Sequence, residues 1–260
     1  MTKEERYDEL VKKVNKCSYF NDCSTDKKSG MQKLKLCPEC NEINLWTYWE
    51  GGRDSLDAEI LVVGQDWGQI KDDKAMSAAL KTAKDPAARA GYMDTFHDPG
   101  KLTNETLCRL FHEIGLSEVE SDYRTGERKC SKVFFTNYIC CYRVGKTSGD
   151  VEDTWTNNCR GYFEKLVSII EPRVIICLGK KVFDSVSEAA GIPVSREKYH
   201  ETVAKGAVTM NINGVSVKVF PMAHPGVMGL LNTCRFRSEK ASVERGRQLQ
   251  AEDWRKIIQD

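Results

Sequence analysis

The stretch EILVVGQD at residues 59–66 decides the fold class, because an apolar, β-branched run there ends in a glycine followed by two polar side chains. Its composition and short length are typical of a strand that is buried on both faces. Three further runs have the same character, at residues 132–136 (KVFFT), 173–178 (RVIICL) and 215–221 (VSVKVFP). The chain therefore carries four candidate strands for one central sheet.

Helical patterns separate these strands. We expect helices from Thr103 or Asn104 to Ile114, from Glu152 to Ile170 and from Lys180 to Ala190. Strands that alternate with helices predict an α/β fold, here a three-layer α/β/α sandwich with a central four-stranded, mainly parallel sheet. Asn213-Gly214 is a hairpin turn signal, so the last strand gains an antiparallel companion at residues 208–212.

The two ends of the chain also have helical character. An amphipathic helix is expected near the start, with Tyr7, Leu10, Val11 and Val14 on one face, and a charged amphipathic helix over residues 239–258. The polar composition of residues 18–30 predicts a surface loop. We therefore divide the chain into an N-terminal helix and loop extension, residues 1–36, and a main domain, residues 37–260.

Composition excludes several classes of protein. The chain has 260 residues, 40% hydrophobic and 30% charged, which is enough to bury a full core in one domain. Its 39 Lys and Arg balance 38 Asp and Glu, so a nucleic-acid partner would need a local basic face. No apolar run is long enough for a signal peptide or a membrane span. We expect a monomer in the cytoplasm or another reducing compartment, where the 11 cysteines stay reduced or bind metal.

Polar side chains follow three of the predicted strands, at the edge where ligands bind in parallel sheets. Asp66 follows the first strand, Asn137 the second and His224 the last. Each has a structural alternative: Asp66 as a helix N-cap, Asn137 as a loop-stabilising amide and His224 as a structural histidine. Because all three side chains are expected at the same edge of the sheet, we predict a ligand-binding or catalytic site there.

In these motifs the chain resembles the uracil-DNA glycosylase superfamily. The resemblance runs in order through residues 64–68 (GQDWG), 134–137 (FFTN), 170–179 (IEPRVIICLG) and 224–226 (HPG), and spans roughly residues 37–237. It implies an enzyme that flips uracil out of DNA and hydrolyses its N-glycosidic bond. Two other readings stay open, a non-catalytic nucleic-acid-binding member of the superfamily and a small-molecule nucleoside hydrolase.

The cysteines extend the resemblance to the iron-sulfur (family 4) glycosylases. These hold a four-iron cluster with a Cys-x2-Cys pair before the first strand and two later cysteines. The corresponding residues here are Cys37, Cys40, Cys141 and Cys159. A zinc ion on the same four thiolates is an alternative, as is a zinc knuckle of Cys17, Cys23, Cys37 and Cys40. The remaining cysteines, Cys108, Cys130, Cys140, Cys177 and Cys234, have the character of buried apolar residues.

The resemblance also implies the role of each site residue. Asn137 would read the uracil edge, and Phe96, or Tyr92, would stack on the base. Gly64 and Gln65 are further substrate-binding candidates, with the Gln65 and Asp66 backbone amides as candidate donors to the base. Asp66 would orient water and stabilise the positively charged sugar, and His224 would donate a hydrogen bond to uracil O2.

Two departures from the family patterns bear on specificity. Gln65-Asp66-Trp67-Gly68 stands where the iron-sulfur enzymes usually carry Glu-Ala-Pro-Gly, so the chain combines a family 1-like Gln-Asp pair with the cysteine frame of family 4. Gly68 stands where family 1 enzymes place the Tyr that excludes thymine, which leaves that task to another group such as Trp67.

Contact with DNA is expected around His224. Val227 and Met228 fit the family's intercalating loop, with the start of a buried helix as the alternative. Arg235 and Arg237 are candidates for phosphate contacts, with ordinary solvated charges as the alternative.

Overall fold

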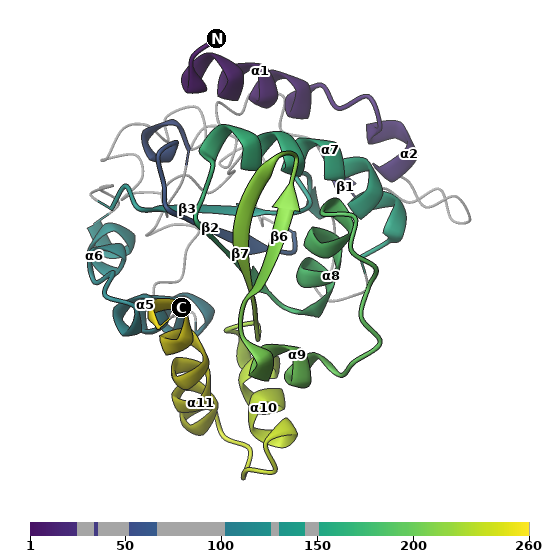
Figure 1. Cartoon of the computed structure of the whole chain (residues 1–260). Coiled ribbons are helices and arrows are strands. Elements are labelled where there is room, and N and C mark those ends of the chain that lie inside the picture. The colour runs from purple at the N-terminus through teal and green to yellow at the C-terminus, as the bar shows by residue number, and fades with distance from the viewer. Residues whose placement is uncertain (25–33, 36–51, 67–101, 126–129, 144–150, 260) are drawn as a thin grey trace.

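The computed structural model of the chain describes residues 1–24, 34–35, 52–66, 102–125, 130–143 and 151–259 (Figure 1). Its central sheet has the strand order β3-β2-β5-β7-β6. The strands are β2 (Ile60–Gly64), β3 (Val133–Asn137), β5 (Val174–Leu178), β6 (Val208–Ile212) and β7 (Val215–Met222). The first three and β7 are mutually parallel, and β6 pairs antiparallel with β7. The predicted sheet and its hairpin companion are confirmed, and within the described ranges this sheet has five strands.

Alternate side chains of the central strands enter two separate hydrophobic cores. On β2, Leu61 and Val63 belong to one core and Val62 to the other. On β5, Ile175 and Ile176 divide in the same way. This alternation is what a sheet covered on both faces requires, and it explains why these strands are continuous apolar runs.

Helices cover both faces of the sheet and complete the three-layer sandwich (Figure 1). The first core lies under α1 (Lys3–Asn15), α7 (Asp153–Ile170) and α8 (Lys180–Ala189). The second lies under α5 (Leu102–Glu113), α6 (Glu118–Thr125) and α11 (Val243–Arg255). The expected helices therefore form, whereas α6 was not predicted.

Short elements fill in the rest of the described chain. They are α2 (Phe20–Ser24), α9 (Tyr199–Lys205), α10 (Val227–Phe236), the paired strands β1 (Leu34–Lys35) and β4 (Tyr142–Arg143), and the 3-10 turns η1 (Arg53–Ser55) and η2 (Lys256–Ile258).

Two predicted segments need correction. The expected loop at residues 18–30 contains α2, whose Cys23 is buried and accepts a hydrogen bond at its carbonyl from Trp155 Nε1 at 3.1 Å. The last helix begins at Val243 instead of residue 239, because Ser242 caps it by accepting a hydrogen bond from the Arg245 amide at 3.1 Å.

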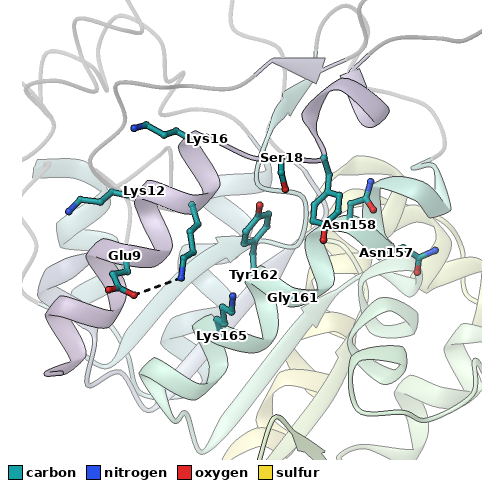
Figure 2. A pocket seen from close by; sticks show the side chains of 11 residues that line it. Glu9, Lys12, Lys16, Ser18, Asn157, Asn158, Gly161, Tyr162 and Lys165 are labelled. Carbon is teal, nitrogen blue, oxygen red and sulfur yellow. Dashed lines mark ion pairs between the residues drawn. The ribbon is translucent and has the colours of Figure 1, made fainter.

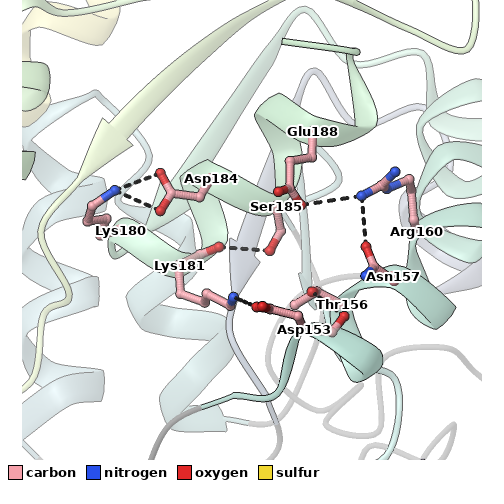
Figure 3. Close-up of polar contacts among 9 residues, drawn as sticks. All are labelled: Asp153, Thr156, Asn157, Arg160, Lys180, Lys181, Asp184, Ser185 and Glu188. Atoms are coloured by element: carbon pink, nitrogen blue, oxygen red, sulfur yellow. Dashed lines mark hydrogen bonds and ion pairs between the residues drawn. The ribbon is translucent and has the colours of Figure 1, made fainter. Parts of the chain in front are cut away.

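Polar contacts connect α7 with α8, two of the helices that cover the first core (Figure 3). Lys181 Nζ lies 2.6 Å from Asp153 Oδ1, and an Arg160 nitrogen lies 3.3 Å from Glu188 Oε2. Exposed pairs of this kind contribute at most about 1 kcal/mol each. The buried side chains of Phe163 and Val186 therefore contribute more to the packing of α7 and α8 than the ion pairs do. The ion pairs help to fix the orientation of one helix relative to the other.

The N-terminal helix packs into the same core as the sheet. Thr2 and Glu5 form a capping box that starts α1. The four predicted apolar residues of α1 are all buried, and the ring of Tyr7 meets that of Phe134 on β3 edge-on, with centroids 6.1 Å apart. The boundary predicted at residue 36 stays a prediction. None of the helices in the described ranges is long and apolar enough to cross a lipid bilayer.

Candidate functional site

Gly64 and Asn137 face each other at the carboxyl ends of neighbouring strands. They are register partners in the β2–β3 pair, and the chain beyond them stays joined because the Tyr138 amide donates to Gly64 O at 2.9 Å. A Cβ placed on Gly64 would overlap Asn137 Oδ1, so the Asn137 amide lies directly over the glycine. This close approach is why residue 64 is a glycine.

The Asn137 side chain is buried and available. It is 7% exposed, and among the described residues no hydrogen bond satisfies its amide group. An amide without an internal partner can bond to a ligand without first breaking a hydrogen bond of the protein. Its donor and acceptor pair matches a planar base edge.

His224 follows β7 and has a defined tautomer. The Gly226 amide donates to His224 Nδ1 at 3.0 Å, so Nδ1 is the acceptor and a neutral ring carries its proton on Nε2. The side chain reaches solvent, yet desolvation by the surrounding protein lowers the pKa of His224, while the Asp66 carboxylate opposes this shift. The imidazole is therefore neutral at pH 7, with Nε2–H available as a donor.

The backbone of His224 is held from two sides. Gln250 on α11, itself 2% exposed, donates from Nε2 to His224 O at 3.2 Å. Gly229 on α10 lies so close to the same carbonyl that a Cβ there would overlap it. Sequence reasoning missed Gln250 and Gly229, because both act through contacts between distant elements.

Asp66 lies between the other two groups of the site. It is half-buried just beyond β2, and Gln65 Nε2 donates to Asp66 Oδ1 at 2.9 Å. Its effect on the pKa of His224 shows that the carboxylate acts on the imidazole across the sheet edge. An acid, an amide and a neutral imidazole thus follow the carboxyl ends of β2, β3 and β7 at one edge of the sheet.

Comparison with known families agrees with this arrangement. Residues 52–239 match the family model of the uracil DNA glycosylase superfamily, which is well over half of the chain, and the protein belongs to that superfamily. A search of curated proteins finds no match. Membership supports a glycosylase-type hydrolase that acts on DNA.

The predicted DNA-contacting residues lie on α10, just after His224. Val227 and Met228 are the first two residues of this helix and are 47% and 62% exposed, so they begin a helix without being buried in it. Arg235 is exposed and donates to Asn232 Oδ1 at 3.1 Å. Arg237 pairs with Glu252 and Asp253, at 2.9 and 2.6 Å, so its charge is already compensated.

A mainly apolar cavity of about 520 Å³ borders His224 on the side of α9, α10 and α11. The ring of His200 stacks on that of Phe236 along its wall, with centroids 4.7 Å apart. Lys256 reaches Asp253 at 3.1 Å, the carboxylate that Arg237 also contacts. The cavity therefore extends the site with a mainly apolar surface, and its charged side chains include the mutually paired Arg237, Asp253 and Lys256.

Several predicted residues lie outside the described ranges. These are the stacking candidates Phe96 and Tyr92, the Trp67-Gly68 pair, and the metal-ligand candidates Cys37 and Cys40. Their roles stay predictions.

The other two candidate ligands belong to a group of cysteines beside the Asn137 loop. Cys141 and Cys159 are buried, and a side-chain hydrogen bond joins Cys159 to Cys140, raising the pKa of Cys140 and lowering that of Cys159. Burial, then the nearby Cys159, Cys17 and Cys23, raises the pKa of Cys141. Cys140, expected to be a plain packing residue, is thus part of this thiol group.

Thiols are suitable donors for an iron-sulfur cluster or zinc, so the chemistry of this group fits either. Within the described ranges, however, no three His, Cys, Asp or Glu side chains are arranged to hold a metal ion. Completing the ligand set would therefore require cysteines from elsewhere in the chain, such as Cys37 and Cys40.

Proposed function

We propose that the protein excises uracil from DNA by hydrolysing the bond between uracil N1 and the sugar C1′. The observation that carries the proposal is the amide of Asn137, which has no hydrogen-bond partner among the described residues and is held over Gly64 within a chain of the uracil DNA glycosylase superfamily. The amide would donate to uracil O4 and accept from N3–H, which selects uracil over cytosine.

Cleavage leaves positive charge on the sugar and the bonding electron pair on uracil. Asp66 would stabilise the sugar cation and orient the water whose hydroxyl adds to C1′. The water's second proton would leave toward the Asp66 carboxylate and ultimately balance the charge on uracil. The Nε2–H of neutral His224 would donate to uracil O2 as charge gathers there, and the Gly226 amide keeps the proton on that nitrogen.

The test is an excision assay on an oligonucleotide that contains one uracil, with abasic product as the readout. Wild type should release uracil, and His224→Ala should lose roughly a hundredfold in rate, since one oriented donor is worth about 3 kcal/mol. Asn137→Ala should lose activity and affinity for the uracil base together.

Three results would contradict the proposal. Binding of uracil-containing DNA without abasic product would indicate a non-catalytic nucleic-acid-binding protein. Release of uracil from free deoxyuridine, with no salt-dependent affinity for DNA, would indicate a nucleoside hydrolase. Equal rates in wild type and His224→Ala would remove the imidazole from the mechanism.

The proposal includes a four-iron, four-sulfur cluster on Cys37, Cys40, Cys141 and Cys159, with structural zinc on the same thiolates as the alternative. Support comes from Cys141 and Cys159, which share one thiol group beside the Asn137 loop. When bound, the cluster would tie the N-terminal segment to α7 and to that loop, and it would take no part in the reaction.

Metal analysis and the visible absorption spectrum of purified protein test this assignment. A brown protein with four irons supports the cluster, whereas a colourless one with stoichiometric zinc supports the alternative. Iron should be lost in Cys37→Ala and Cys40→Ala. If Cys37→Ala and Cys40→Ala keep their iron while Cys17→Ala and Cys23→Ala lose it, the ligands are Cys17 and Cys23 instead.

A further inference from the structure

A lysine-lined groove lies between α1 and α7, on the face of the sheet that these helices cover (Figure 2). Its volume is about 820 Å³. Lys12, Lys13 and Lys16 come from the end of α1, and Lys165 comes from α7 across the groove. Among the described side chains that line it, Glu9 is the only acidic one. This lysine groove therefore concentrates positive charge in a protein whose net charge is only +1.

Most of that charge is uncompensated. Lys13 Nζ lies 3.8 Å from Glu9 Oε2, the ion pair drawn in Figure 2. Lys12, Lys16 and Lys165 are exposed and form no ion pair within the part of the chain that the structure describes. Three cations that the protein itself leaves unpaired can accept an external anion without first breaking an internal contact.

The groove also presents groups that suit a nucleic-acid strand. Tyr19 is 46% exposed at its rim, and Asn157 and Asn158 line the adjoining wall. Exposed aromatic rings stack on unpaired bases, and lysine and asparagine side chains are common contacts of phosphate and sugar oxygens. An acidic peptide would satisfy the lysines but would leave the ring of Tyr19 without a matching planar partner.

The position of the groove connects it to the candidate site. Tyr162 on its floor makes a side-chain hydrogen bond with Cys17, and Asn158 Nδ2 donates to Cys23 Sγ at 3.1 Å. Cys17 and Cys23 act electrostatically on Cys141, which follows Asn137 by four residues. The groove therefore adjoins Cys17 and Cys23, the cysteines on its side of the thiol group.

We propose that the lysine groove is a second nucleic-acid contact surface, which binds the phosphate backbone of a DNA strand away from the excised base. The choice of DNA as the polymer rests on the proposed function. The groove would hold the flank of the substrate and supply sequence-independent affinity through Lys12, Lys16 and Lys165.

The test measures affinity for uracil-free DNA by fluorescence anisotropy over a series of salt concentrations. Lys12→Gln, Lys16→Gln and Lys165→Gln combined should flatten the slope of log K against log salt by roughly 2–3, since each phosphate contact contributes about 0.9 on duplex DNA and 0.7 on a single strand. The triple Lys→Arg variant should retain the wild-type slope.

The control removes the same formal charge from exposed lysines outside the groove, as Lys132→Gln, Lys198→Gln and Lys205→Gln combined, of which Lys205 is paired with Glu197. Its slope should stay near the wild-type value. Equal slopes for wild type and groove variant, or equal flattening in groove variant and control, would overturn the proposal. Equal competition by a glutamate-rich peptide of matched charge would also overturn it, in favour of an acidic protein partner.

These measurements do not depend on excision, because the DNA carries no uracil. Loss of salt-dependent affinity in the groove variant supports the lysine groove even if wild-type protein proves inactive on uracil. A groove variant with wild-type affinity and full excision activity refutes the groove and leaves the proposed function standing.

Discussion

At the scale of single residues, the absence of a side chain at Gly64 sets the position of the Asn137 amide. Gly64→Ala should displace that amide and cost about 1–3 kcal/mol of transition-state stabilisation, roughly a 10- to 100-fold loss in kcat/KM for uracil excision. The reason is steric, since the new methyl group would occupy the space of Asn137 Oδ1. Steady-state kinetics on uracil-containing DNA measure the effect.

The control for Gly64→Ala is the same change made in an Asn137→Ala background. There the methyl group meets no amide, so it should add little further loss. A full additional loss in the double variant would mean that Gly64 acts through something other than Asn137.

The neutral imidazole of His224 predicts a pH dependence of stability. Its folded pKa is lowered by desolvation, so the unfolded chain binds a proton more readily below the ordinary histidine pKa of about 6.5. Stability is therefore fully present above that value and declines as the pH falls through the folded pKa. When the pH is lowered from 7.5 to 5.5, the melting temperature of wild type should fall by more than that of His224→Asn. Equal decreases in the two proteins would contradict a lowered folded pKa of His224.

At the scale of elements, the sequence predicts strands better than helix ends. The central strands begin and end within one residue of expectation, because each is a continuous apolar run. The hairpin also forms as predicted, with positive φ at both Asn213 and Gly214. By contrast, the seven residues of α9 are too few to show a helical period, and the two-residue pair β1–β4 joins segments more than a hundred residues apart.

Helix α7 contains a glycine whose replacement should stabilise the fold. Gly161 lies in the helix with open space around its Cβ position, so Gly161→Ala should raise the free energy of unfolding by about 0.5–1 kcal/mol. Gly191 has equally open space but a φ of 71°, so Gly191→Ala should destabilise instead. Urea denaturation of both variants measures the change in the free energy of unfolding. A change of the same sign in Gly161→Ala and Gly191→Ala would contradict this explanation.

At the scale of the whole molecule, the sequence predicts which residues meet at the candidate site, but not the contacts that hold them there. Asp66, Asn137 and His224 each follow a recognisable strand, and the parallel topology then brings them to one edge. The bond from Gln250 to the His224 carbonyl depends instead on how α11 packs across α10, which no local pattern specifies. The thiol group likewise joins residues from α2, α7 and the loop after β3.

The packing of the whole molecule also makes the N-terminal helix α1 a part of the core, although it lies outside the family match. The family match begins at residue 52, yet Leu10 of α1 is 2% exposed and belongs to the core that contains Phe134 and Val167. Leu10→Ala should therefore lower the free energy of unfolding of the entire protein by about 2–5 kcal/mol, with one cooperative transition in guanidinium. Lys12→Ala, on the exposed side of α1, should change it by less than about 0.5 kcal/mol. A separate early transition for α1, with the main transition unmoved, would show that residues 1–36 fold independently of the sheet.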